Sequence, residues 1–173
     1  MNSYKYEYRL TNAALTHAPK IYNNFSFIIK NMYRRVVLPT DGSDLSMQGV
    51  KEGLKLAKTL DIPATAIYVI EIGDIRISDK VRESLKKTAE RALAQVENAA
   101  NEMGVELETE TFKGTPYEEI CDFAEDDDVI YISSHGMSGF REIFMGSTTN
   151  RILKHAVCTV SVVKGKPGKV EDE

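Results

Sequence analysis

The sequence predicts an α/β fold, in which an open, parallel, five-stranded sheet is covered by helices on both faces. Three observations predict it. Five short runs of apolar and β-branched residues recur along the chain, four segments with helical spacing separate them, and glycine, proline or polar residues mark the boundaries. Helical crossovers between apolar strands are typical of a parallel sheet with right-handed connections that is buried on both sides.

The first part of the pattern runs through residues 35–39 and 64–70, which both read as buried strands. RVVLP is a short apolar run, and ATAIYVI is rich in β-branched residues. Between them, apolar residues recur near helical spacing as far as about Leu60. Ser43 or Asp44 can cap that helix.

A long helix is predicted over residues 78–103, because a serine opens it and Gly104 stops it. Residues 105–112 then alternate apolar and polar side chains, as a strand at the edge of a sheet does. A helix over residues 116–125 follows, with proline in its first position. These elements extend the alternation of strand and helix.

Residues 129–132 form the next predicted strand, residues 148–155 a helix, and Thr159 to Val163 the last strand. In such sheets, ligands bind beyond the carboxyl ends of the strands, where the strand order reverses. If the first and fourth strands are neighbours at that point, the connector after the first strand, residues 40–43, and the connector that starts at Ser133 line one crevice.

The two ends of the chain differ from this pattern. Residues 1–31 hold four of the eight tyrosines and have no clean period of 2 or 3.6, so we expect an extension outside the fold. The alternative is an arm that packs on a partner through its tyrosines. Residues 165–173 are polar, with glycine and proline, and predict a flexible tail. The folded domain is expected over residues 32–164.

Charge and composition argue against several classes of function. The net charge of −4 leaves no basic excess for binding a nucleic acid. No apolar run approaches the roughly 20 residues that span a bilayer, so no membrane association is expected. Cys121 and Cys158 match no metal or redox spacing, which favours a reduced, cytoplasmic protein.

The segment from Ser133 to Ser147, SSHGMSGFREIFMGS, is the strongest candidate for a binding site. It leaves a strand, contains Gly136 and Gly146, and ends at the start of a helix. Unpaired N–H groups and partial positive charge at a helix start suit a phosphate. Ser147 and Thr148 could donate hydrogen bonds to it, although ordinary N-capping explains them equally well and the glycines could merely permit turns.

Other candidate residues have two interpretations each. Asp41 could accept hydrogen bonds from the amino group or ribose of a ligand, or it could cap the helix or close an Asx-turn with Gly42. His135 has no serine or cysteine placed to form a relay, so no catalytic residue is predicted. The acidic run 125–128 is expected to be the solvated end of a helix rather than a metal site. No GxxxxGK[ST] or GxGxxG motif occurs.

Four stretches of the chain carry a family resemblance: RRVVLPTDGS, AIYVIE, SSHGMSGFREIFMGSTTNRILKHA and TVSVVK. On these, residues 33–164 resemble the UspA-like domain of the universal stress protein family. ATP-binding members carry the pattern G-x2-G-x9-G-[ST] in the long loop. Its last two glycines fall here on Gly136 and Gly146 and its hydroxyl on Ser147, whereas Ser133 replaces the first glycine.

The resemblance implies a Rossmann-like fold, similar to adenine nucleotide alpha hydrolases, with strand order 3-2-1-4-5. It also implies a homodimer formed through the last strand, Thr159 to Val163, and an ATP site that Mg or Mn could share with the phosphates. Asp41 and the backbone of Val69 would hold adenine, and residues 146–148 would clasp the phosphates. The binding residues that it implies are Pro39, Thr40, Asp41, Val69, Ile132, Ser133, Gly136, Gly146, Ser147 and Thr148.

Ser133 is the departure from the family pattern. If its position requires left-handed backbone angles, serine costs roughly 1–2 kcal/mol relative to glycine. ATP affinity would then fall about five- to thirtyfold if the whole cost appeared in binding. Alternatively, its small hydroxyl could replace a contact with the ligand.

The sequence leaves three functions open. The leading one is an ATP-binding stress-response or regulatory protein with little or no turnover. A second is an interaction module of the same fold that binds no nucleotide, which Ser133 favours. The third is an enzyme that cleaves ATP between the α and β phosphates. In such enzymes the loop after the first strand resembles SGGxDS. This chain has PTDGSD there, without the paired glycines, so we expect a weak ATPase at most.

Overall fold

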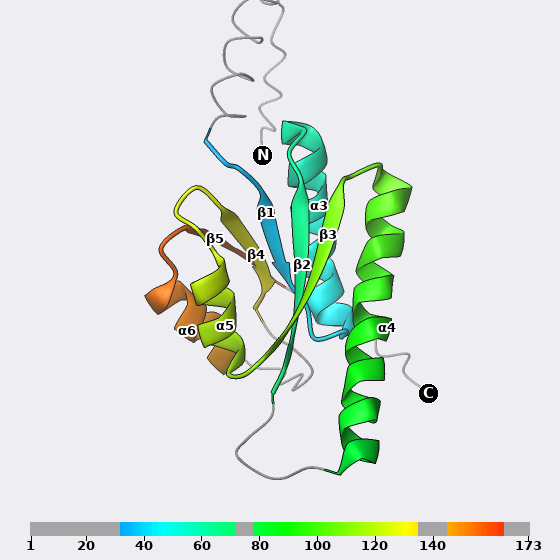
Figure 1. Ribbon diagram of the computed structural model, residues 1–173. Helices are drawn as coiled ribbons and strands as arrows, with labels where there is room; N and C mark the ends of the chain where they lie inside the picture. The colour runs from blue at the N-terminus through cyan, green and yellow to red at the C-terminus, as the bar shows by residue number, and fades with distance from the viewer. Residues whose placement is uncertain (1–31, 72–77, 135–144, 165–173) are drawn as a thin grey trace, which may run out of the picture.

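Five parallel strands form one sheet between two layers of helices in the computed structural model, which describes residues 32–71, 78–134 and 145–164 (Figure 1). The strands are β1 (Val36–Pro39), β2 (Ala64–Ile70), β3 (Leu107–Lys113), β4 (Val129–Ser133) and β5 (Thr159–Val163). The helices are α3 (Asp44–Leu60), α4 (Asp79–Met103), α5 (Pro116–Phe123) and α6 (Ser147–His155).

The strand order is β3-β2-β1-β4-β5, the order that the family resemblance implies, and all neighbouring strands are parallel, as the helical crossovers predict. The chain places β2 and β3 on one side of β1, then crosses back to place β4 on the other side. The order therefore reverses between β1 and β4, at the centre of the sheet (Figure 1). Ligands of open α/β sheets bind at such a point.

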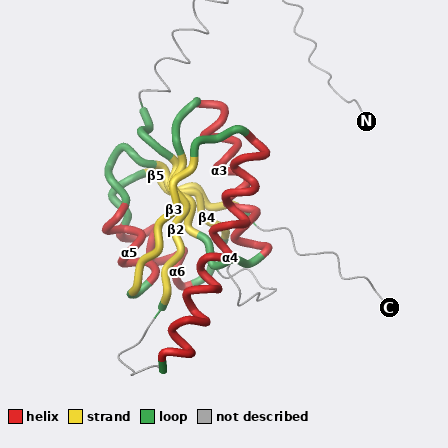
Figure 2. The backbone as a smooth tube through the Cα atoms, turned by 45° about the vertical axis from the view of Figure 1, so that its right-hand side comes forward, coloured by secondary structure: helices red, strands yellow, loops and turns green. Residues whose placement is uncertain are grey.

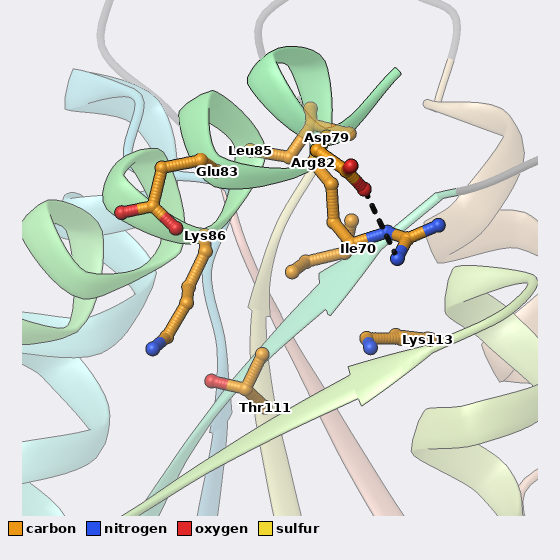
Figure 3. A pocket seen from close by; sticks show the side chains of 8 residues that line it. All are labelled: Ile70, Asp79, Arg82, Glu83, Leu85, Lys86, Thr111 and Lys113. Atoms are coloured by element: carbon orange, nitrogen blue, oxygen red, sulfur yellow. Dashed lines mark ion pairs between the residues drawn. The ribbon is translucent and has the colours of Figure 1, made fainter. Parts of the chain in front are cut away.

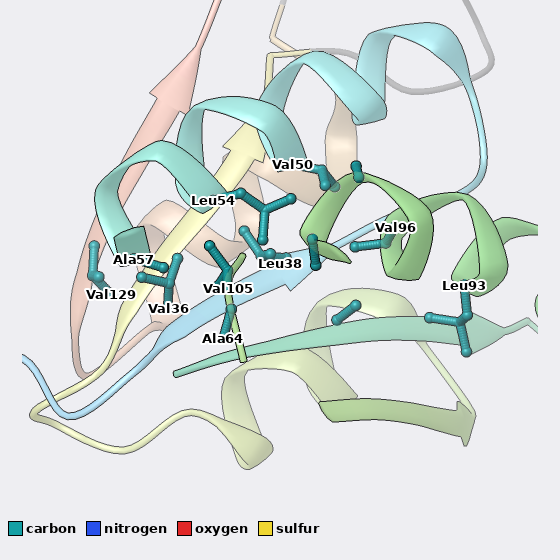
Figure 4. Packing of buried hydrophobic residues seen from close by; sticks show 13 residues of the cluster. Val36, Leu38, Val50, Leu54, Ala57, Ala64, Leu93, Val96, Val105 and Val129 are labelled. Atoms are coloured by element: carbon teal, nitrogen blue, oxygen red, sulfur yellow. The ribbon is translucent and has the colours of Figure 1, made fainter. Parts of the chain in front are cut away.

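Helices α3 and α4 cover one face of the sheet. Val36 and Leu38 of β1 point to this face and lie in one apolar cluster with Val50 and Leu54 of α3 and Val96 of α4 (Figure 4). All five are fully buried. Complete burial of one aliphatic side chain stabilises the folded state by about 1.5–3 kcal/mol. This cluster therefore holds β1 firmly in the middle of the sheet.

Helices α5 and α6 cover the opposite face. Val37 of β1, Ile67 of β2 and Ile130 of β4 belong to a second cluster, which also contains Ile120 of α5 and Ile152 of α6. Figure 2 shows the strands between α3 and α4 on one side and α5 on the other. Because successive residues of β1 point to opposite, buried faces, its sequence is continuously apolar.

The helix ends follow the predicted signals. The N-cap of α3 is Ser43, whose Oγ accepts a hydrogen bond from the backbone N–H of Ser46 (3.1 Å). Ser78 caps α4 through the N–H of Val81 (3.4 Å). Gly104 ends α4 with a φ of 68°, a left-handed conformation that glycine adopts without a steric penalty.

A few boundaries differ from the prediction. β3 begins later than expected, at Leu107, α5 ends earlier, at Phe123, and α6 begins one residue earlier, at Ser147. Ser133 is the last residue of β4 and pairs with β5. It therefore belongs to the sheet, and the long connector starts after it.

One acidic residue has an environment that the sequence analysis did not predict. Residues 125–127 are exposed, but Asp128 is completely buried, so the interpretation of the run as solvated was wrong for this residue. Its carboxylate accepts hydrogen bonds from Nε and Nη2 of Arg35 (3.1 and 2.9 Å) and from Nη2 of Arg34 (3.2 Å). The backbone N–H of Glu125 donates another (2.9 Å). A buried carboxylate requires such partners.

Within the described residues, no helix combines the length and the apolar character needed to cross a membrane. The expected extension (residues 1–31), the expected tail (residues 165–173), and both Gly136 and His135 of the long loop lie outside the described residues.

Candidate functional site

A cavity of about 370 Å³ lies beyond the carboxyl ends of β1, β2 and β4. Its volume is within the range of about 300–1,000 Å³ that is usual for small-molecule sites. Nine of the ten predicted binding residues line it: Pro39, Thr40, Asp41, Val69, Ile132, Ser133, Gly146, Ser147 and Thr148. The tenth, Gly136, is outside the described residues.

The reversal of strand order brings these residues together. The connector after β1 enters α3, which packs on one face of the sheet, whereas the connector after β4 enters α6, which packs on the other. The described residues at the ends of β1 and β4 and at the starts of α3 and α6 thus leave a crevice between them. Residues 39–41 and 146–148, far apart in the sequence, line the same space, as expected.

Asp41 has a structural role at the mouth of this cavity. Its Oδ1 accepts hydrogen bonds from the backbone N–H of Ser43 (3.0 Å) and from the Ser43 hydroxyl (2.6 Å). This is the Asx-turn that the sequence allowed, with Gly42 at its centre and Ser43 as the donor. Because Asp41 also lines the cavity, the structural interpretation and the ligand-binding interpretation are compatible.

Thr40 fixes the backbone next to Asp41. Its side-chain oxygen lies 3.0 Å from the Ser46 hydroxyl and accepts a hydrogen bond from the N–H of Gly42 (3.1 Å). Its own N–H donates to the carbonyl of Ile67 in β2 (2.9 Å). Thr40 is buried, so these bonds hold the start of the connector in one conformation.

Ser133 does not carry the backbone strain that the family pattern suggested. Among the described non-glycine residues, only Asp61 has a positive φ, so Ser133 has the extended backbone of a strand. The conditional cost of left-handed angles therefore does not arise. Ser133 is buried at the end of β4 and lines the cavity, where a serine fits as well as a glycine in backbone terms.

Helix α6 directs its N-terminus at the cavity. Its N-cap is Gly146, which provides no side-chain hydrogen bond, whereas serine hydroxyls cap α3 and α4. The interpretation of Ser147 or Thr148 as the N-cap is therefore wrong. The first N–H groups of a helix have no partner within the helix and carry partial positive charge. Gly146, Ser147 and Thr148 form a wall suited to an anion.

Several lining residues were missed by the sequence analysis: Ser46, Ile67, Tyr68, Ile70, Glu71, Leu85, Pro116, Ile120 and Thr149. Glu71 follows the end of β2, and Thr149 continues the run of hydroxyls after Gly146, so the sequence position of each could have marked it as a lining residue. Nothing in the sequence marks Leu85 or Ile120, because only the packing of α4 and α5 on the sheet decides which helical residues reach the cavity.

The charge of Asp41 acts on Tyr68, which lines the same cavity. Burial raises the pKa of the Tyr68 phenol, and the negative charge of Asp41 raises this pKa further. Tyr68 therefore remains a neutral phenol well into the alkaline range. In that form it can donate a hydrogen bond as well as accept one.

A second cavity, of about 420 Å³, lies beside the first between α4 and the ends of β2 and β3 (Figure 3). The two cavities share Ile70 and Leu85. Its charged wall consists largely of long side chains of α4, among them Arg82, which pairs with Asp79 at 3.7 Å, and Lys86. None of the predicted binding residues lines it, so the first cavity is the candidate site.

The described residues contain no group of three or more His, Cys, Asp or Glu side chains that could hold a metal ion. Cys121 and Cys158 are free thiols. Burial raises the pKa of both, with neighbouring carboxylates, Asp122 and Asp128 respectively, raising it further. A raised pKa disfavours the thiolate, so neither cysteine has the environment of a nucleophile.

The model of the universal stress protein family matches residues 32–164. The chain belongs to this family. It is 37% identical over 148 residues to the universal stress protein MJ0531 of Methanocaldococcus jannaschii, an alignment that covers 81% of this chain and 86% of the relative.

Solved structures of family members have the same fold. MJ0577 of M. jannaschii superimposes with a TM-score of 0.68 at 27% identity, over 79% of this chain and 99% of that one. A universal stress protein of Archaeoglobus fulgidus, solved in complex with dAMP, has a TM-score of 0.56 at 21% identity, over 77% and 99% of the two chains. Both agree with the Rossmann-like order of strands described above.

Proposed function

We propose that this universal stress protein binds an adenine nucleotide, ATP in particular, in the cavity between β1 and β4, and acts in a stress response or its regulation with little or no turnover. The observation that carries the proposal is the shared cavity: a carboxylate after β1 and an uncapped helix start after β4 line one space of suitable volume. The carboxylate can bind the base or ribose of a nucleotide, and the helix start can bind its phosphates.

The base would lie at the end formed by β1 and β2. Ile67 and Val69 of β2 provide an apolar wall, and Asp41 provides a carboxylate that can accept a hydrogen bond from an amino group or a ribose hydroxyl. Pro39 and Thr40 complete this wall. An apolar slot with one well-placed polar group is the usual form of a small-molecule site.

The phosphates would lie at the start of α6. Ser147 and Thr148 line the cavity in the first turn of α6, where backbone N–H groups have no partner within the helix, and Ser147 adds a hydroxyl donor. The family includes a member solved in complex with dAMP, also an adenine nucleotide, which supports this class of ligand. A helix start of this kind binds phosphate without a cationic side chain.

A divalent cation, Mg or Mn, would accompany the phosphates of ATP. The ionised side chains among the described lining residues, Asp41 and Glu71, are both carboxylates. Their negative charge repels a triphosphate, and a bound cation reduces that repulsion. We expect ATP to bind more tightly with Mg than with a chelator, whereas adenosine should bind equally under both conditions.

The test is calorimetric titration of ATP into the wild type, Gly146→Val and Asn150→Val. A branched side chain at Gly146 would occupy the space that the phosphates need, so ATP affinity should fall at least about tenfold. Asn150 lies exposed on the same helix outside the cavity and is the matched control, with affinity unchanged. Equal ATP affinities for the wild type and Gly146→Val would refute the proposal. The release of nucleotide products from ATP by the wild type should stay near background, because little or no turnover is proposed.

We also propose a homodimer formed through β5. The two edge strands differ: β3 has exposed Glu108 and Glu110, whereas β5, TVSVV, contains no charge. Charged residues protect a sheet edge from pairing, so β5 is the edge that is open to a second copy. Val157, just before β5, is 68% exposed and Leu153 of α6 is 43% exposed, which adds apolar surface beside this edge.

A further inference from the structure

We infer that Thr149 is a positioning residue for phosphate recognition, which holds the start of α6 against the end of β4 in place of an ordinary N-cap. Its hydroxyl donates a hydrogen bond to the carbonyl of Ser133 (3.0 Å), sixteen residues earlier in the chain. The inference rests on the proposed function, because it concerns how the same cavity receives an anionic group.

The need for such a residue follows from the missing cap. Gly146 has no side chain that could accept from the first turn, so the N–H groups of that turn remain available to a ligand. An uncapped helix start also frays more readily than a capped one. Some other contact must therefore fix the start of α6 if it is to present these groups in a constant direction.

Two hydrogen bonds, to the last residue of β4 and to the residue after it, provide this contact. The N–H of Gly146 donates to the carbonyl of Ser134 (2.8 Å), and Thr149 donates to that of Ser133. The end of β4 is itself fixed, because the N–H of Ser134 donates to the carbonyl of Val163 in β5 (2.9 Å). The helix start is thus joined to the sheet at two points of one turn.

Thr149 acts on the ligand indirectly. It is only 4% exposed, and its single hydroxyl proton is used in the bond to Ser133. That proton cannot also be donated to a phosphate. Removal of the hydroxyl should therefore leave the base end of the cavity unchanged and weaken only the phosphate end, since the bond ties the helix start and not β1 or β2.

The experiment compares Thr149→Val, which removes the hydroxyl at nearly constant shape, with Thr149→Ser, which retains it. Thr59→Val is the matched control, because the Thr59 hydroxyl is exposed and bonds the carbonyl of Lys55 in α3, with neither residue lining the cavity. Calorimetric titrations of ATP, AMP and adenosine give the phosphate contribution as the ratio of adenosine and nucleotide affinities.

Thr149→Val should weaken ATP and AMP about five- to tenfold and adenosine less than twofold, as the loss of one hydrogen bond predicts. Thr149→Ser should restore most of the nucleotide affinity, and Thr59→Val should change nothing. Equal losses for adenosine and ATP would show a general structural role and overturn the inference. Unchanged ATP affinity in Thr149→Val would overturn it as well.

A second readout separates this inference from the proposed function. The N–H of Asn150 donates to the carbonyl of Gly146 (2.9 Å), the first bond of α6, so its hydrogen exchange reports fraying without any ligand. Exchange at Asn150 should accelerate several-fold in Thr149→Val and not in Thr59→Val. A wild type that binds no nucleotide would refute the proposed function, whereas unchanged exchange at Asn150 would refute the role of Thr149.

Discussion

Gly49 of α3 lies directly against the backbone of Ser133 at the end of β4. A Cβ atom at Gly49 would be 2.9 Å from the backbone nitrogen of Ser133 and 3.2 Å from the carbonyl carbon of Ile132. Because backbone atoms cannot rotate away as a flexible side chain does, the helix can approach the strand this closely only where Cβ is missing. The contact packs α3, which contributes to the apolar cluster on one face of the sheet, against Ser133, which lines the cavity.

Gly49→Ala should therefore destabilise the protein, although alanine favours a helix more than glycine does. Helix propensity alone would stabilise by up to about 1 kcal/mol, whereas overpacking costs about 1–3 kcal/mol. We expect a net loss of free energy of unfolding, measured by urea denaturation, together with weaker nucleotide binding because Ser133 moves. Lys51→Ala, exposed on the same helix, is the control. A Gly49→Ala variant more stable than the wild type would contradict the packing described.

Two variants separate the role of Asp41 as a hydrogen-bond acceptor from the role of its charge. Asp41→Ala removes the acceptor of both hydrogen bonds from Ser43 and should cost about 1 kcal/mol in the free energy of unfolding. Asp41→Asn retains an acceptor oxygen, so its stability should be nearer that of the wild type.

The charge of Asp41 can be followed through Tyr68. In Asp41→Asn the pKa of Tyr68 should fall but remain above its ordinary value, since burial is its larger cause. NMR titration of the labelled tyrosine rings measures it. No change in the Tyr68 pKa on loss of the charge would exclude the interaction of the two side chains.

Asp128 should be the carboxylate with the greatest effect on stability among residues 125–128. Removal of one partner from a buried ion pair typically costs about 3–5 kcal/mol, because the other charge loses its compensation. Asp128→Ala leaves the guanidinium of Arg35, whose side chain is only 15% exposed, without its buried carboxylate partner. Asp126→Ala, in the same run but exposed, should change the free energy of unfolding by less than about 0.5 kcal/mol. Thermal and urea unfolding of both variants measure the difference.

The same residue predicts a dependence on pH. Burial by itself would raise the pKa of Asp128, but hydrogen bonds from Arg35 and the N–H of Glu125, with the charges of Arg35 and Arg34, hold it below its ordinary value. The stabilisation is therefore fully present above the unfolded-state pKa of about 3.9 and is lost as the pH falls through the lower folded-state pKa. Asp128→Ala should lack this part of the acid transition. If the free energies of unfolding of the wild type and of the variant depended on acid pH in the same way, this role of Asp128 would be contradicted.

The proposed dimer predicts that Val157→Asp raises the dissociation constant of the dimer about tenfold or more, because it places a charge in apolar surface beside β5. Val81→Asp is a matched control, since Val81 is also an exposed valine (45%) but lies on α4. Sedimentation velocity at several concentrations measures both variants. A wild type that stays monomeric at high concentration, or an equal effect of the two variants, would exclude this interface.

The sequence was sufficient to predict the architecture because each strand and helix carries a local signal. Ser43, Ser78 and Gly104 mark helix ends, and β-branched runs mark the strands, so tertiary contacts only had to agree with local preference. The strand order came from the family resemblance. Once that order is known, parallel strands place the ends of β1 and β4 together, which accounts for most of the cavity.

What the sequence could not predict depends on contacts between distant segments. Burial of Asp128 requires Arg34 and Arg35 to fold over it, and acidic residues in a run usually face solvent. The role of Thr149 requires the carbonyl of Ser133 beside it. The backbone of Ser133 could not be inferred from the family motif, since a glycine in a motif does not by itself reveal a positive φ.

The most direct test of the central claim is an amide NMR titration of the isotope-labelled protein with ATP and Mg. One cavity shared by the two connectors predicts that the amides of Thr40 to Ser43 and of Ser147 to Thr149 shift together, with one dissociation constant for both segments. Shifts confined to one connector, or centred instead on Arg82 and Lys113 of the second cavity, would contradict it.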